Sequence, residues 1–73
     1  MTVSELFYHF SCYFSRIDFS VDDSPFRTVL HVKEDGAAQD DFEKKYAEFF
    51  VDFWEYDVSD NGIYISIRRG CYD

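Results

Sequence analysis

Apolar residues near the start of the chain recur at helical spacing. Stepping about 100° per residue places one set of them within a sector of roughly 120°. This set consists of Val3, Leu6, Phe7, Phe10, Tyr13 and Phe14. Thr2 and Glu5 have the spacing of a capping box, in which each side chain bonds to the backbone N–H of the other residue. The pattern predicts an amphipathic helix of about three turns that begins at Val3.

The hydrophobic period then changes to two. In 16–22 the apolar residues are Ile17, Phe19 and Val21, which is the pattern of a strand covered on one face. A turn signal at 23–25 separates this run from a second extended run over 26–33. We therefore expect a hairpin. The buried face of its second strand would take Phe26, Thr28, Leu30 and Val32, with Arg27, Val29, His31 and Lys33 outward.

A second helix is predicted over 37–53. Its aromatic residues occupy about 100° of the helical wheel and its charged residues the opposite side. The aromatic set is Phe42, Tyr46, Phe49, Phe50 and Phe53, and the charged set is Asp41, Lys44, Lys45, Glu48, Asp52 and Glu55.

Alternation returns after this helix. Trp54, Tyr56 and Val58 alternate with polar residues, and the Asn61-Gly62 pair is a strong hairpin signal. We expect a third strand over 54–58, with one further helical turn as the alternative there, and a return strand over 63–69 with three isoleucines on one face. Residues 70–73 would form a loose tail.

These elements predict one domain over 1–73 with the order αββαββ. Each helix has one apolar stripe, and the four strands together have one apolar face. The expected fold class is therefore α+β, a two-layer sandwich in which two helices cover one face of a four-stranded antiparallel sheet made of two hairpins.

Composition and charge narrow the function classes. The 73 residues are 47% hydrophobic and 22% aromatic, which opposes a disordered chain. A formal charge of -8 opposes direct binding to nucleic acid or anionic lipid and favours a basic partner. No run approaches the roughly 20 apolar residues of a membrane span, and residues 1–10 lack the basic start of a signal peptide. We expect a soluble intracellular protein.

The residues that commonly carry chemistry are sparse. Cys12 and Cys71 are the only cysteines, which suggests two free thiols in a reducing compartment, with a single bridge as the alternative. His9 and Cys12 could offer two ligands to one zinc ion, but closing the site would need His31 and Cys71. Glycine-rich phosphate loops and nucleophile motifs are missing from the sequence. We expect no metal, no cofactor and no enzymatic activity.

The acidic residues are the main candidates for partner binding. On the predicted helix, Asp41, Glu48, Asp52 and Glu55 would form a negative ridge that approximates phosphate spacing along a nucleic-acid strand. Further acidic positions would extend this surface: Asp57, Asp22, Asp23, Glu34 and Asp35. The alternative is an acidic face that serves only solubility.

Exposed tyrosines are a second unusual feature. Tyr8, Tyr64 and Tyr72 have no predicted core position, and tyrosine is enriched at interfaces. We expect the preferred contact patch to be Tyr64 beside Val29 and His31.

The 1–6 opening Met-Thr-Val-Ser-Glu-Leu, the acidic body and the 60–67 strand Asp-Asn-Gly-Ile-Tyr-Ile-Ser-Ile resemble small accessory proteins of bacteriophages and prophages, the class that includes the anti-CRISPR proteins. This resemblance implies a stoichiometric inhibitor in the cytoplasm of an infected or lysogenic bacterium. Its partner would be a CRISPR effector or another defence protein with a basic nucleic-acid-binding surface. The alternative is an interaction or regulatory subunit that forms a homodimer or binds a host protein through its aromatic sheet face or an edge strand.

Overall fold

The computed structural model describes residues 1–10, 12–22 and 24–70. Two helices and four strands follow the predicted order αββαββ. They are α1 (Val3–Tyr8), β1 (Arg16–Val21), β2 (Thr28–His31), α2 (Ala37–Tyr46), β3 (Phe50–Asp57) and β4 (Gly62–Arg68).

The four strands form one sheet in the order β2-β1-β4-β3. The two predicted hairpins are confirmed, since β1 pairs with β2 and β3 pairs with β4, both antiparallel. The purely antiparallel sheet is wrong, because β1 and β4 run parallel. The isoleucine-rich β4 and β1 take the two interior positions, each with a neighbouring strand on both sides, and the charged β3 is left at the edge.

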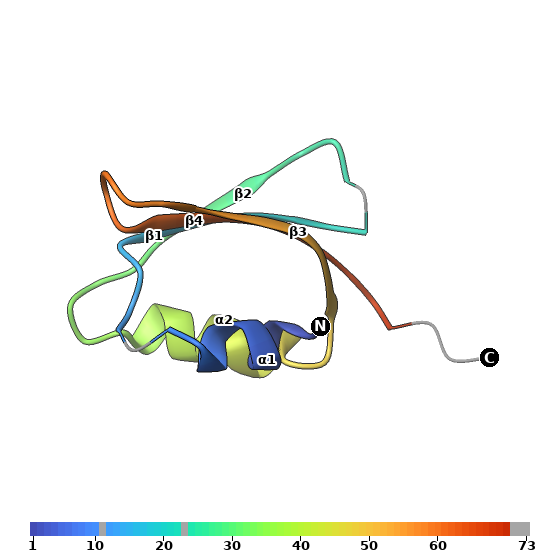
Figure 1. Ribbon diagram of the computed structural model, residues 1–73, viewed down its shortest axis with the longest axis horizontal. Helices are drawn as coiled ribbons and strands as arrows, with labels where there is room; N and C mark the ends of the chain where they lie inside the picture. Colours follow the sequence, from blue (N-terminus) through green and yellow to red (C-terminus); the bar gives the residue numbers. More distant parts are fainter. Residues whose placement is uncertain (11, 23, 71–73) are drawn as a thin grey trace.

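Both helices lie on the same side of the sheet in Figure 1. The residues buried between the helices and the sheet form one hydrophobic cluster. Its members are Val3, Leu6, Phe7, Phe14, Ile17, Phe19, Phe42, Ile63, Ile65 and Ile67. The predicted burial of the three isoleucines of β4 is therefore confirmed. We call the opposite side of the sheet the outer face.

Helix α1 begins as predicted and ends earlier than predicted. The capping box at Thr2 and Glu5 is confirmed, with Thr2 N–H donating to Glu5 Oε1 at 2.9 Å. The expected three turns are wrong, because the helix ends at Tyr8. Phe14 N–H donates to the buried Gln39 side chain of α2 at 2.9 Å, and this contact holds the following segment as a loop across α2.

Helix α2 ends at Tyr46, so the predicted helix to residue 53 is also wrong. Phe49 N–H donates to the carbonyl of Tyr46 at 3.0 Å, and Val3 N–H donates to the carbonyl of Phe49 at 2.9 Å. These bonds turn the chain from the helix layer into the sheet. The run after Phe49 is rich in aromatic and β-branched residues, which favour a strand once a neighbouring strand is available.

Strand β2 is shorter and less covered than expected. Phe26 precedes it and is 80% exposed, and Thr28 is exposed as well, so their predicted burial is wrong. Leu30 and Val32 are half-buried. This strand lies at an edge of the sheet, where only one neighbour shields it.

A β-bulge in β3 decides which side chains reach the outer face. Val51 lies opposite Ile67, whereas Phe53 lies opposite Ser66, so Asp52 is an extra residue in the ladder. Because side chains alternate with a period of two, one extra residue reverses the faces of all later positions. The predicted alternation over 54–57 is confirmed as strand, which excludes the alternative helical turn, and Val58 falls in the following turn.

Candidate binding site on the outer face of the sheet

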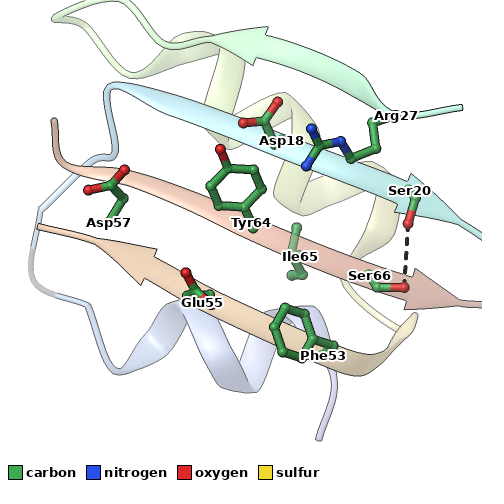
Figure 2. A pocket seen from close by; sticks show the side chains of 9 residues that line it. All are labelled: Asp18, Ser20, Arg27, Phe53, Glu55, Asp57, Tyr64, Ile65 and Ser66. Carbon is green, nitrogen blue, oxygen red and sulfur yellow. Dashed lines mark hydrogen bonds between the residues drawn. The ribbon is translucent and has the colours of Figure 1, made fainter. Parts of the chain in front are cut away.

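The outer face carries rows of side chains that run across the strands. In one row, Asp18 lies opposite Val29 on one side and Tyr64 on the other, and Tyr64 lies opposite Glu55. Figure 2 shows this row from Asp18 through Tyr64 to Glu55. The predicted patch of Tyr64 with Val29 and His31 is therefore divided, because Asp18 separates Tyr64 from Val29 and His31 lies opposite Arg16.

A groove of about 430 Å³ lies on this face. Ser20 and Ser66 face one another within it, with their Oγ atoms 3.4 Å apart. Their small side chains leave space between Tyr64, Arg27 and Phe53 (Figure 2). The phenyl ring of Phe53 is 57% exposed at the β3 edge, where a partner can reach it.

Arg16 holds one end of the outer face together. Its guanidinium forms an ion pair with Asp18, a second with Asp60 at 2.9 Å, and a longer one with Asp57 at 3.8 Å. The hydrogen bonds that Arg16 donates to Asp60 are the largest cause of the raised pKa of Arg16. A Cβ at Gly62 would overlap the Arg16 guanidinium, so a larger residue there would displace Arg16 from this cluster.

Tyr64 is held between two cationic groups. The guanidinium carbons of Arg16 and Arg27 lie 5.0 Å and 5.1 Å from the centre of its ring. Cation–π contacts of this geometry contribute about 0.5 to 1 kcal/mol each at partly exposed sites. The ring is therefore positioned before any partner arrives.

The predicted acidic ridge does not exist as a helix face. Asp41 lies on α2 and Glu48 in the connection to β3, whereas Asp52, Glu55 and Asp57 lie on β3 itself. The correction follows from the early end of α2, because helical spacing no longer relates these positions.

Most of the remaining predicted acidic residues are engaged locally. Asp52 forms an ion pair with Arg68 at 2.7 Å, and Asp22 forms one with Arg69 at 3.2 Å. Asp35 accepts a hydrogen bond from the N–H of Ala37 at the start of α2.

Glu34 lies exposed in the loop before α2, and Asp23 lies outside the described residues. The predicted acidic positions are thus spread over both layers of the domain.

Glu55 differs from the other carboxylates of β3. Asp57 accepts hydrogen bonds from the side chain and N–H of Ser59, which lower its pKa, with a smaller contribution from Arg16. Within the part of the chain that the structure describes, the side chain of Glu55 has neither a hydrogen bond nor an ion pair. It therefore presents a free negative charge next to Tyr64.

Sequence reasoning missed Arg16, Asp18 and Phe53. The alternation over 16–22 gives Arg16 and Asp18 only as polar positions of a strand, and the helical wheel places Phe53 in a helix. The available signal for Asp18 was its position between Ile17 and Phe19. Asp18 is buried although it lies on the polar side of its strand.

The remaining candidate residues lie on other segments or outside the described part of the chain. Cys12 is exposed and unbridged, Tyr8 is exposed on α1, and Cys71 and Tyr72 lie outside the described residues. Among residues 1–10, 12–22 and 24–70, no three His, Cys, Asp or Glu side chains come together in a way that could hold a metal ion.

In the same described ranges, no helix combines the length and apolar character needed to cross a membrane. Comparison with protein-family models, curated proteins and solved structures finds no match to this chain.

Proposed function

We propose that this protein is a non-enzymatic binding module that docks the β3 side of its outer face onto a basic surface of a partner protein. The observation that carries the proposal is Glu55, an unpaired carboxylate that lies opposite the positioned Tyr64 and two residues along β3 from the exposed Phe53. Aromatic side chains flanked by charge are typical anchors of protein interfaces.

The chemistry of this site suits an arginine or lysine side chain. Glu55 offers a carboxylate for a charge-assisted hydrogen bond, and the exposed Phe53 beside it offers a ring face for a cation. Most other carboxylates on this face already form an ion pair with an arginine of this chain. Glu55 is therefore the carboxylate that remains to bind a cation of the partner protein. The net charge of -8 would speed the encounter with a basic surface through long-range attraction.

A basic nucleic-acid-binding site is the partner surface that fits the phage-inhibitor resemblance. An inhibitor of this kind needs no catalytic group, only a surface that occupies the site and excludes nucleic acid. We propose that β3 and the groove supply this surface, in place of the helical ridge that the sequence suggested.

The test compares two charge reversals that have the same effect on net charge. Glu55→Lys changes the proposed site, and Asp41→Lys changes an exposed carboxylate on α2. Partners would be captured from a bacterial lysate that contains CRISPR and restriction systems, identified, purified, and measured by titration calorimetry with each variant.

We expect Glu55→Lys to weaken binding at least about tenfold, a loss of about 1.4 kcal/mol, and Asp41→Lys to change it much less. Wild-type binding should weaken between about 50 and about 300 mM salt, because added ions screen the charge pairs. Equal losses from the two reversals would mean that only net charge matters and would refute the proposed site.

A further inference from the structure

The N-terminal residues already bridge the outer edge of β3 at its beginning. Thr2 forms an antiparallel bridge with Phe50, and Val51 N–H donates to the carbonyl of Met1 at 2.8 Å. The N-terminal residues therefore cover the edge only up to Val51. Beyond that point, the structure gives the outer edge of β3 no backbone partner among the described residues.

The uncovered part of this edge is regular. From Phe53 to Asp57 the register with β4 runs without interruption, and the bulge at Asp52 separates this stretch from the covered beginning. Five residues span about 17 Å, which is the length of an ordinary strand. The other sheet edge, β2, has only four residues.

Charge decides which strand this edge favours. β3 contains three carboxylates and no basic residue. A second copy of the chain would bring the same three carboxylates and a further charge of -8 to the interface. Like charges on neighbouring strands are destabilising, whereas opposite charges stabilise the pair. The edge therefore disfavours self-pairing and favours a basic strand.

We propose that the edge from Phe53 to Asp57 binds an extended basic segment of the partner as a fifth strand of the sheet. This inference rests on the proposed function and specifies how the partner docks. Residues of the added strand opposite Glu55 and Asp57 share the outer face and would be lysine or arginine. Those opposite Trp54, which is 41% exposed on the inner side, would be apolar.

The probe is a capped peptide of alternating lysine and valine. Two further peptides carry N-methyl groups, one on every lysine and one on every valine. In an added strand only alternate residues direct their N–H toward the sheet, so one methylated peptide loses these hydrogen bonds and the other keeps them. Binding would be measured by NMR titration, with hydrogen exchange of the β3 amides in the free and bound protein.

We expect the plain peptide and one methylated peptide to bind, and the other methylated peptide to bind at least about tenfold more weakly, since several strand hydrogen bonds are lost. Backbone amides between Phe53 and Asp57 should exchange more slowly in the complex. Glu55→Gln, which removes the charge at an exposed position, should weaken all three peptides.

Two failures are distinguishable. If the plain peptide binds through Glu55 but both methylated peptides bind equally well, strand addition is refuted and the proposed function stands. If the plain peptide does not bind, or binds without regard to Glu55, strand addition is refuted, and the comparison of Glu55→Lys with Asp41→Lys decides the proposed function separately. A dimer that protects the β3 amides without peptide would overturn the charge argument.

Discussion

Replacing Arg16 by methionine tests whether the outer face is held together by a desolvated charge cluster. The Arg16 side chain is 17% exposed and its partner Asp18 is 8% exposed, so both groups are largely removed from water. Methionine preserves much of the length and packing of arginine while removing its charge. Asp18 would then remain buried without a cation beside it.

The expected cost follows from these contacts. Removing one partner of a buried ion pair costs about 3 to 5 kcal/mol, because the other charge stays desolvated. The Asp57 and Asp60 side chains are more exposed, and such pairs contribute only about 0 to 1 kcal/mol each. We therefore expect Arg16→Met to lower the free energy of unfolding by about 3 kcal/mol or slightly more.

This loss is large for a domain of 73 residues. At about 0.05 to 0.15 kcal/mol per residue, the whole domain is stable by roughly 4 to 11 kcal/mol. A loss of about 3 kcal/mol corresponds to a fall in Tm of roughly 10 to 25 °C for a domain of this size. The variant should therefore still fold at low temperature, where its stability can be measured.

Urea denaturation provides the assay. Trp54 is the only tryptophan, and its ring lies 6.0 Å from that of Phe10, so its fluorescence reports the packing of β3 against the first loop. Circular dichroism gives an independent probe of the same transition. The double variant Arg16→Met with Asp18→Asn completes a mutant cycle.

We expect the double variant to lose less stability than the sum of the two single losses, because neutralising Asp18 removes the uncompensated charge. A loss below about 1 kcal/mol for Arg16→Met would contradict the reasoning, since that value is typical of a hydrated surface pair. Strict additivity in the cycle would also refute a direct coupling between the two groups.

Three further predictions concern the helix layer and the response to pH. Gly36→Ala should lower stability by at least about 1 to 2 kcal/mol in urea denaturation, because Gly36 has φ +70° and a Cβ there would overlap the Tyr13 ring. The pKa of Asp57 is lower in the folded state than in the unfolded state, where it is near 4, so the ionised carboxylate stabilises the fold above about pH 4. This contribution is lost as the pH falls through the folded-state pKa. Asp57→Asn should therefore reduce the acid-induced loss of stability in a pH series. Burial raises the Glu43 pKa, so Glu43→Gln should raise the Tm at pH 7, and an unchanged or lower Tm would contradict this.

The helix and strand periods predicted the order of elements but not their lengths. The aromatic residues from Phe42 to Phe53 satisfy a helical wheel, yet Phe50 and Phe53 lie in β3. A helical stripe and a strand can share the same residues when most positions are aromatic. Which one forms depends on the free edge of β4, and a local pattern contains no information about that neighbour.

The candidate site was predictable only in part. The sequence identified Glu55 and Tyr64 as partner-binding residues, but it did not place them opposite one another and gave Glu55 helical neighbours. Phe53 was missed because its face depends on the bulge at Asp52. A bulge is an adjustment between two paired strands, so it becomes visible only when the register of β3 and β4 is known.

The sequence by itself determined the features that depend on near neighbours in the chain. These are the capping box of Thr2 and Glu5, the two hairpins, and the burial of the β4 isoleucines, because caps, tight turns and alternation act over a few residues. The tertiary structure alone decided the parallel pairing of β1 with β4, the end of α2 and the contacts of Arg16. Each of these depends on groups distant in the sequence, whose packing outweighs the local preference of the chain.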